Sequence, residues 1–351
     1  MPETRLCAAA MSGGVDSSAA AHLLRTDGYG VRGVTFRMHC ISGTEDPIPA
    51  AAAVCRALDL PHTAIDASAE FHDAVMADFV REYTAGRTPN PCVVCNRTIK
   101  FPLLCRFADT LSPDACIATG HYAKLIRYGS RLAITKAADP AKDQSYMLWQ
   151  LPQEILARLL LPLGGYTKAE IREIARQANL PSAASKDSQD ICFIPDGDYT
   201  KFLADSGVSL TPGHFIDEAG TVLGSSKNQA SYTIGQRKGL GIALGHHMYV
   251  TARDAANNRI TISPSDPYAK TVRASSVMCM AASPEDLHSP RRLTAKLRYT
   301  RAEFPCTAVL ENDTLTVTLD DPARAPAPGQ SLVLYDGNAV VAGGIIDTWE
   351  V

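Results

Sequence analysis

The first half of the chain alternates short apolar runs with longer amphipathic stretches. The apolar runs predict strands at residues 6–10, 31–36, 62–66 and 115–118. Between them, the amphipathic stretches predict helices at residues 16–25, 49–58, 68–83 and 96–109. Strands that alternate with helices at this spacing indicate an α/β fold, in which helices cover both faces of a parallel sheet.

One further helix is marked by its first residues. Thr167 is followed three positions later by Glu170, which is the spacing of a capping box. This helix is expected to run to about Ala178 and to be closed by Pro181, and residues 182–195 are expected to form a loop.

The pattern changes near residue 205, where helical periodicity gives way to short alternating runs separated by Gly, Pro, Asn and Asp. Strands are predicted at residues 247–251, 259–263, 314–319 and 331–335, with a linker at 265–268. Runs of this kind are typical of small β-barrels or sandwiches. We therefore expect a doubly wound parallel-sheet domain over residues 1–205 and two small barrel-like domains over 206–270 and 271–351.

Composition narrows the class of protein. Hydrophobic residues make up 46% of the 351 positions and charged residues 20%, which excludes wholesale disorder. The 34 Lys and Arg against 37 Asp and Glu give a net charge of −3, which excludes a globally basic nucleic-acid binder but not a local basic face. No apolar run approaches the roughly 18 residues of a membrane span, and no apolar signal core opens the chain. A soluble, cytoplasmic protein with no membrane partner is predicted.

The segment at residues 11–18, MSGGVDSS, lies between the first strand and the first helix. Gly13 and Gly14 allow the backbone to approach a phosphate, and the helix N-terminus favours an anion. Ser12, Ser17 and Ser18 add hydroxyl donors. An ordinary strand-to-helix turn is the alternative interpretation. The P-loop motif GxxxxGK[ST] is absent from the sequence, and the glycine spacing at 239–245 does not fit a dinucleotide fingerprint.

The loop resembles the pyrophosphatase-type loop SGGxDS. Enzymes that carry it split ATP into AMP and pyrophosphate, and they typically adenylate a carbonyl oxygen. Amidating synthetases and RNA thiolases both fit this loop, so the remainder of the chain has to decide between them.

Ten cysteines in a cytosolic enzyme suggest catalysis, metal binding or burial rather than a disulfide framework. Cys92 and Cys95 form a CxxC just ahead of a predicted helix, where the dipole should lower the thiol pKa, and Arg87 and Arg97 should add to this. The same spacing could clamp a metal or close a redox disulfide. Cys192 lies in the predicted loop. The remaining cysteines are expected to be buried apolar residues, and they complete no second CxxC of a zinc site: Cys7, Cys40, Cys55, Cys105, Cys116, Cys279 and Cys306.

An adenylating loop together with separated reactive cysteines suggests sulfur chemistry. The C2 oxygen of a uridine is a poor leaving group, and adenylation converts it into AMP, which leaves readily. A cysteine persulfide can then attack the carbon, and a second cysteine can cleave the resulting S–S linkage.

Seven blocks in order closely resemble the tRNA-specific 2-thiouridylase family. They are MSGGVDSS at 11–18, GRTPNP at 86–91, CN at 95–96, TGHYA at 119–123, KDQSYM at 142–147, SQDICF at 188–193 and YTIGQRKGLG at 232–241. The family architecture that this implies is a PP-loop ATP pyrophosphatase domain followed by two small β-barrels. The activity that it implies is ATP-dependent 2-thiolation of the wobble uridine (U34) of tRNA.

The resemblance also implies roles for individual residues. Cys95 would be the nucleophile and Cys192 the persulfide carrier. The target base would meet Asn90, Pro91 and Cys92. The residues implied to bind ATP are Ala10, Met11, Ser12, Gly13, Gly14, Val15, Asp16, Ser17, Phe36 and Gly120, with Phe36 following the second strand. The residues implied to bind tRNA are His121, Lys142, Asp143, Gln144, Arg298, Tyr299 and Gln330.

The partners implied are tRNA and a sulfur-donor protein, either a cysteine desulfurase or a sulfur-relay carrier. Mg²⁺ is expected with ATP, and Asp16 is the one residue suggested as its ligand. Many family members have Asp where this chain has Cys92. The resulting CxxC leaves open a second hypothesis, in which Cys92, Cys95 and Cys192 hold an iron–sulfur cluster with one open iron.

Two rival functions remain. An amidating or condensing synthetase such as argininosuccinate synthase needs neither paired cysteines nor barrels. A tRNA- or nucleotide-binding module would show no chemistry at all. The basic stretch of Arg291, Arg292, Lys296, Arg298 and Arg301 is interpreted as a phosphate-tracking surface or as a solvated strand face, and His246 and His247 are interpreted as structural.

Overall fold

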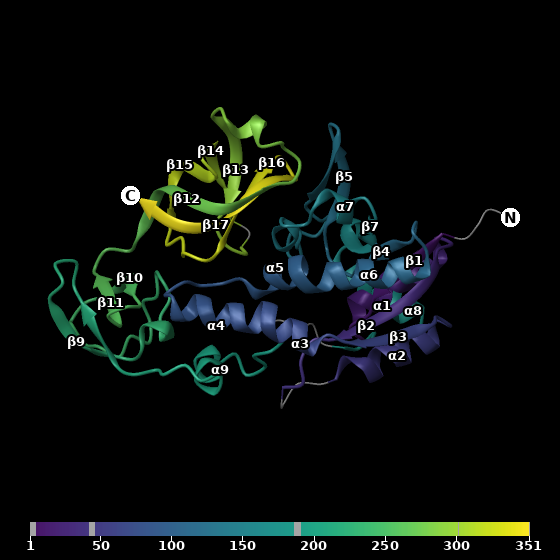
Figure 1. Ribbon diagram of the computed structural model, residues 1–351, viewed down its shortest axis with the longest axis horizontal. Helices are drawn as coiled ribbons and strands as arrows, with labels where there is room; N and C mark the ends of the chain where they lie inside the picture. Colours follow the sequence, from purple (N-terminus) through teal and green to yellow (C-terminus); the bar gives the residue numbers. More distant parts are fainter. Residues whose placement is uncertain (1–4, 42–45, 186–190, 301, 351) are drawn as a thin grey trace. The chain divides into compact units, whose positions relative to one another are not determined.

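The computed structural model describes residues 5–41, 46–185, 191–300 and 302–350. The chain forms two compact units (Figure 1). Unit 1 comprises Met1–Val75, Cys92–Pro195 and Asn338–Val341, and unit 2 comprises Met76–Pro91, Asp196–Gly337 and Ala342–Val351. Each unit therefore combines segments that are distant in the sequence.

A five-stranded parallel sheet forms the centre of unit 1, which confirms the predicted fold class. Its order is β3-β2-β1-β4-β7. The strands are β1 (Leu6–Ala10), β2 (Gly30–Arg37), β3 (His62–Asp66), β4 (Cys116–Ala118) and β7 (Leu159–Leu160). Strand order reverses between β1 and β4, and ligands of open α/β sheets bind outside the carboxyl ends of strands at such a point.

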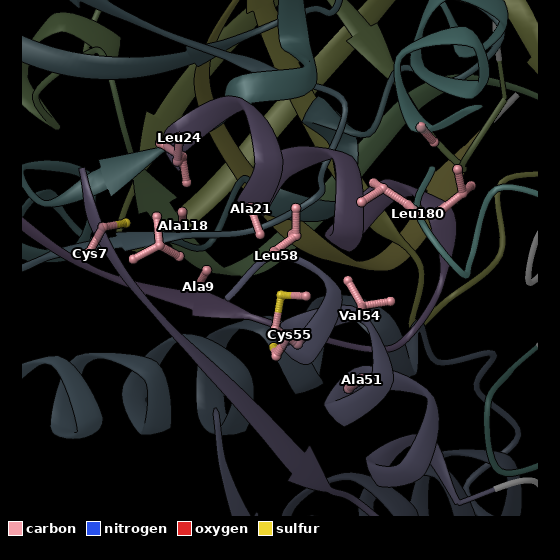
Figure 2. Close-up of a cluster of buried hydrophobic side chains, with 14 of the residues drawn as sticks. Cys7, Ala9, Ala21, Leu24, Ala51, Val54, Cys55, Leu58, Ala118 and Leu180 are labelled. Atoms are coloured by element: carbon pink, nitrogen blue, oxygen red, sulfur yellow. The ribbon is translucent and has the colours of Figure 1, made fainter. Parts of the chain in front are cut away.

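Helices pack on both faces of this sheet. On one face, α1 (Val15–Thr26), α2 (Pro47–Ala57) and α8 (Lys168–Gln177) enclose a core with β1 and β4. Figure 2 shows Cys7 and Ala9 of β1 with Ala21 and Leu24 of α1 and Val54 of α2. α6 (Phe101–Leu111) contacts β1 and β4 but adds no side chain to this cluster of described residues, so it covers the opposite face.

Two predicted helices contain π-helical turns. The 68–83 prediction corresponds to α3 (Ser68–Phe71), the π turn η1 (His72–Met76) and α4 (Ala77–Thr84). The 96–109 prediction corresponds to α5 (Pro91–Cys95), the π turn η2 (Asn96–Lys100) and α6. The predicted start at Asn96 was wrong, because Pro91 occupies the first helical position, where its fixed φ suits a helix. Cys92 and Cys95 therefore lie inside the helix rather than ahead of it.

The capping box is confirmed. The Thr167 side chain accepts from the Glu170 amide, and the Glu170 carboxylate accepts from the Thr167 amide at 2.7 Å. The described residues of 182–195 contain no helix or strand. A hairpin of β5 (Lys124–Tyr128) and β6 (Arg131–Thr135) was not predicted. The other short helices of unit 1 are η3 (Ser145–Leu148), α7 (Gln153–Leu156) and η4 (Pro162–Gly165).

Unit 2 contains a small mixed sheet in the order β10-β11-β8-β9. Its strands are β8 (Gly213–Ile216), β9 (Val222–Ser226), β10 (Tyr249–Asp254) and β11 (Arg259–Ser263), and only the β11–β8 pair is parallel. α9 (Tyr199–Asp205) precedes this sheet, and η5 (Gln229–Ser231) lies within it in sequence. Phe215, Tyr232, Val250 and Ile260 are among the side chains of its core.

The C-terminal strands of the chain form a closed six-stranded antiparallel barrel, in agreement with the prediction. The order is β12-β15-β14-β13-β16-β17, and pairing of β12 with β17 closes it. The elements are β12 (Tyr268–Cys279), η6 (Glu285–Leu287), β13 (Arg291–Lys296), β14 (Phe304–Glu311), β15 (Thr314–Arg324), β16 (Ser331–Asp336) and β17 (Ala339–Glu350). In the described parts of the chain, no helix is both long and apolar enough to cross a membrane.

Candidate active site

The phosphate loop connects β1 to α1 in unit 1. Gly13 has φ +79°, and a Cβ there would lie 2.6 Å from the Cβ of Ala50, so only glycine fits. The Ser17 hydroxyl accepts from the Ser12 amide at 3.1 Å, and the Ser18 hydroxyl donates to the Gly14 carbonyl at 2.8 Å. Gly14 is the N-cap and supplies no side chain to the first amides of α1. A rigid loop with open amides at a helix N-terminus suits a phosphate group.

Gly120 follows β4 and lies against this loop. A Cβ on Gly120 would come within 2.8 Å of the Asp16 carbonyl carbon and the Ser17 nitrogen. Any larger residue would push the two chain segments apart. Phe36 was predicted to follow the second strand, but it lies inside β2 with a buried side chain. A polar contact with a ligand would have to come from its backbone.

Asp16 has two partners that the sequence did not reveal. The Lys168 ammonium lies 2.7 Å from Oδ1 and 2.8 Å from Oδ2, and the Tyr122 hydroxyl donates to Oδ1 at 2.7 Å. Lys168 is the first residue of α8, so the capping box is the sequence signal that could have located it. Asp16 is thus engaged by a cation of the protein itself, which does not suit the suggested role as a magnesium ligand.

The three cysteines of interest interact in unit 1. The thiols of Cys92 and Cys95 both act electrostatically on Cys192, so the fold brings together residues about a hundred positions apart. Cys92 and Cys192 are exposed residues and Cys95 is half-buried. All ten cysteines lie in the described part of the chain, and all are free thiols.

The expected lowering of the thiol pKa values was wrong. Loss of hydration raises the pKa of Cys92 and Cys95, and it raises the pKa of Cys192 to about 12, although Cys192 keeps solvent contact. This loss is the largest cause of the shift in all three thiols. The ammonium of Lys100, a residue that was not among those predicted, partly opposes this rise in the pKa of all three thiols. Lys100 ends the π turn that begins directly after Cys95.

Arg87 and Arg97 do not serve the cysteines as predicted. The Arg87 guanidinium donates to Glu82 at 2.7 Å and to Asp347 at 3.2 Å, and neither arginine contributes to the pKa shifts of Cys92 or Cys95. Glu82, five residues before Arg87, and Asp347, 260 residues after it, both bind the guanidinium. The sequence position of Arg87 near the CxxC could not show this.

An aromatic cluster anchors the segment that carries Cys192. The His39 ring is hydrogen-bonded to the Cys192 backbone, and its centroid lies 5.9 Å from that of Phe71. The Phe71 ring meets Phe193 edge-on at 5.7 Å. Burial lowers the pKa of His39, and the bond to Cys192 partly opposes this. Of the predicted SQDICF block, Ser188, Gln189 and Asp190 lie outside the described residues.

The residues after β4 are largely internal. His121 is buried, burial lowers its pKa well below the usual value, and its Nδ1 bonds the Thr119 hydroxyl at 2.8 Å. Asp143 accepts from the Ser145 hydroxyl at 2.9 Å, and Gln144 accepts from the Tyr122 amide at 2.9 Å. The bonds of Asp143 and Gln144 fix the conformation of the KDQS turn. Because its pKa is lowered, His121 is neutral at pH 7 and would bring no positive charge to an RNA contact.

The predicted base- and tRNA-facing residues of unit 2 are found in three places. Asn90 directly precedes α5, and Pro91 is the first residue of that helix, followed by Cys92 of unit 1. Arg298 donates to the Ala325 carbonyl in the barrel, and Tyr299 beside it is 47% exposed. Gln330 donates to the backbone carbonyls of Thr88 at 3.0 Å and Pro89 at 3.2 Å.

The basic stretch of the barrel is mostly paired with acids. Arg291 lies 2.9 Å from Asp336, Arg292 lies 2.5 Å from Asp320, and buried Lys296 lies 3.7 Å from Glu303. Pairing favours the interpretation as a solvated strand face for Arg291 and Arg292, whereas Lys296 is an internal residue. Arg301 lies outside the described residues. Within the described ranges, no group of three His, Cys, Asp or Glu side chains is arranged to hold a metal ion.

Comparisons with known proteins agree with this architecture. Residues 5–196 match the tRNA methyl transferase HUP domain, residues 200–264 the tRNA methyl transferase PRC-barrel domain, and residues 269–346 the aminomethyltransferase β-barrel domain. A solved U34-tRNA thiolase NcsA from Methanococcus maripaludis, with its [4Fe-4S] cluster, has 18% identity and a TM-score of 0.36, covering 58% of this chain and 66% of that one.

Curated relatives are much more similar. The tRNA-specific 2-thiouridylase MnmA of Lachnoclostridium phytofermentans is 40% identical over 96% of this chain and 98% of its own length. The protein of the same name from Acidithiobacillus ferrooxidans is 41% identical over 97% of this chain and 98% of its own length. The chain therefore belongs to the tRNA-specific 2-thiouridylase family of enzymes.

Proposed function

We propose that the protein is an ATP-dependent tRNA-uridine 2-sulfurtransferase that acts on the wobble uridine. The observation that carries the proposal is that Cys95 and Cys192 interact in the same unit that bears the phosphate loop. A condensing synthetase would need the loop but not the converging thiols, and a binding module would need neither.

The activation step uses the carboxyl edge of the parallel sheet. We assign the ATP phosphates to the loop formed by Ala10, Met11, Ser12, Gly13, Gly14, Val15, Asp16 and Ser17, with Gly120 and the Phe36 backbone beside it. The C2 oxygen of the uridine attacks the α-phosphorus, the bond to pyrophosphate breaks, and the base becomes adenylated. Lys168 neutralises Asp16 so that the loop can accept a polyanion.

Sulfur transfer then uses the two cysteines. The terminal sulfur of a Cys192 persulfide attacks C2, AMP leaves, and the base is joined to Cys192 through an S–S bond. The Cys95 thiolate attacks the Cys192 sulfur, the 2-thiouridine leaves, and Cys95 and Cys192 remain as a disulfide. An external thiol reductant restores them. Lys100 favours the anionic forms that this sequence needs, since it lowers the pKa of both thiols.

RNA contacts are proposed for residues of both units. Asn90, Pro91 and Cys92 face the target base, and His121, Lys142, Asp143 and Gln144 contact tRNA through the KDQS turn and the strand end beside it. Arg298 and exposed Tyr299 contact tRNA from the barrel. We propose domain limits of 1–205, 206–270 and 271–351, a cytoplasmic location, and a cysteine desulfurase or relay carrier as sulfur donor.

A second candidate mechanism is an iron–sulfur cluster on Cys92, Cys95 and Cys192, favoured by the CxxC and by the mutual interaction of the three thiols. Their arrangement is not that of a metal site among the described residues. Cys92→Asp separates the mechanisms. Under the persulfide relay this variant keeps activity. Loss of activity together with a brown, oxygen-sensitive absorbance would establish the cluster.

The function itself is tested with purified protein, unmodified tRNA, ATP and a persulfide donor. Tandem mass spectrometry of the nucleosides should show 2-thiouridine, formed only when both ATP and tRNA are present. Formation of AMP and an amidated small molecule without tRNA would favour a synthetase, and absence of AMP would favour a binding module.

A further inference from the structure

The segment Gly86–Pro89 connects the end of α4 to Asn90, Pro91 and the helix that carries Cys92 and Cys95. It belongs to unit 2, and side chains from the small sheet and from the barrel bond its backbone. A loop that leads into reactive residues is normally free to adopt several conformations. In Gly86–Pro89, by contrast, most backbone N–H and C=O groups form hydrogen bonds with other parts of the protein.

Arg253 of β10 holds the start of the segment. Its guanidinium donates to the Gly86 carbonyl at 2.7 Å and the Thr88 hydroxyl at 3.0 Å, and to the Tyr232 carbonyl at 2.7 Å. Burial lowers the pKa of Arg253, and its Nε is buried without a hydrogen-bond partner among the described residues. Burying a guanidinium that bonds mainly to carbonyls is costly, and stability alone would be better served by an apolar residue.

The turn at the start of β16 holds the middle of the segment. The Thr88 amide donates to the Pro328 carbonyl at 2.7 Å, and the Gln330 side-chain amide donates to the Thr88 and Pro89 carbonyls. Gly329 has φ +92°, and a Cβ there would lie 2.9 Å from the Thr88 nitrogen. The turn can therefore approach the segment this closely only with glycine at 329.

Gln229 and Arg87 complete the arrangement. The Gln229 side-chain amide donates to the Tyr83 carbonyl at 3.1 Å, at the end of α4. Arg87, within the segment, is held by Glu82 and by Asp347 of β17. The segment is thus fixed from its first residue to its last by both β modules of unit 2.

We propose that Arg253 and Gln330 are positioning residues for sulfur transfer. They hold Gly86–Pro89 in one conformation, so that Asn90, Pro91 and Cys92, which follow without a break, meet the target base in a fixed geometry. This rests on the proposed function, and it gives Gln330 a task other than the tRNA contact that the sequence implied. The barrel that bears Arg298 and Tyr299 then also sets the conformation of the base-facing segment.

The test uses the full chain with Gln330→Met, Arg253→Met and Arg253→Lys. Arg292→Met is the matched control, because Arg292 is an exposed barrel arginine that bonds Asp320 and does not touch the segment. Three quantities are measured: persulfide loading of Cys192, the Kd for tRNA, and the single-turnover rate of thiolation at saturating tRNA and ATP. Melting temperature reports folding.

We expect Gln330→Met and Arg253→Met to load sulfur normally and to bind tRNA with a Kd within about twofold of the parent. Their single-turnover rate should fall by about ten- to a hundredfold, as expected when reacting groups are misplaced by about an ångström. Arg253→Lys should recover part of the rate, because an ammonium still donates to carbonyls. Arg292→Met should behave as the parent.

Two results would overturn the proposal. A weaker Kd with an unchanged saturated rate would make Gln330 a direct tRNA contact, and parent-like rates in all variants would make the contacts merely structural. If Arg253→Met does not fold, Gln330→Met alone decides, since Gln330 is only half-buried. A parent protein that makes no 2-thiouridine would reject the proposed function instead, so the two failures are distinguishable.

Discussion

Replacing Lys168 by Met tests the electrostatics of the phosphate loop. The change leaves the Asp16 carboxylate without the ammonium that lies 2.7 Å from it. The Lys168 side chain is 12% exposed and that of Asp16 34%, so the pair lies between the buried and exposed extremes. Exposed pairs contribute about 0–1 kcal/mol, and breaking a buried pair costs about 3–5 kcal/mol. Solvent screens the partly exposed Asp16, so we expect Lys168→Met to reduce the free energy of unfolding by about 2 kcal/mol.

For a unit of this size, that loss lowers Tm by about 4–8 °C. The uncompensated carboxylate also repels the triphosphate, and the same energy corresponds to roughly a thirtyfold lower kcat/KM for ATP. Differential scanning calorimetry and AMP release in the presence of tRNA measure the two effects. Arg176→Met is the control, since Arg176 forms an exposed pair with Glu173 on the same helix and should change neither.

A double-mutant cycle with Asp16→Asn isolates the pair. Coupling near zero, with Tm and AMP release of Lys168→Met within error of the parent, would refute the claim that Lys168 neutralises the loop.

Four further outcomes are expected. Gly13→Ala should abolish AMP release while tRNA affinity stays within about twofold, because the new Cβ collides with Ala50; equal loss of tRNA affinity would contradict a separate phosphate loop. Cys192→Ser should abolish formation of a labelled persulfide on the protein, whereas Cys95→Ser should still form the persulfide but fail to thiolate tRNA. Loss of persulfide formation in both variants would contradict separate roles for the two cysteines. The single-turnover rate should rise from about pH 6 to pH 9, since the attacking species is the thiolate and burial raises the pKa of Cys95; a flat profile would exclude a rate-limiting thiolate. Arg298→Ala should reduce the slope of log Kd for tRNA against log salt by about 1, and an unchanged slope would place the RNA surface elsewhere.

Much of the fold of unit 1 follows from local sequence. The strands at 6–10 and 62–66 are found at the predicted residues. Each is a short run of about five residues bounded by turn or helix signals, a length typical of a strand. The capping box at Thr167 is found for the same reason, since both of its bonds are local. The predicted start at Asn96 was wrong, because a proline can either break a helix or occupy its first turn, and at Pro91 it does the latter.

Several contacts of the candidate site could not be predicted from the sequence, because they join residues that are far apart in the chain. The phosphate loop is contiguous and could be recognised, but its partner Lys168 is 152 residues away from Asp16. The sign of the cysteine pKa shifts depends on desolvation, which only the folded chain determines. Arg87 was expected to serve the thiols, and its carboxylate partners come from α4 and β17. Lys100 could have been suspected from its place one turn beyond Cys95, had the π turn been foreseen.

Transfer of sulfur from Cys192 to the tRNA base is the step on which the proposed function depends most. The most direct measurement loads the purified protein with radiolabelled persulfide sulfur, removes the donor, and adds ATP and unmodified tRNA under anaerobic conditions. We predict that the label moves from Cys192 to 2-thiouridine in a single turnover, with an equimolar amount of AMP and a new disulfide between Cys95 and Cys192. Label that stays on the protein while unlabelled 2-thiouridine forms would contradict the account, because the sulfur would then bypass Cys192.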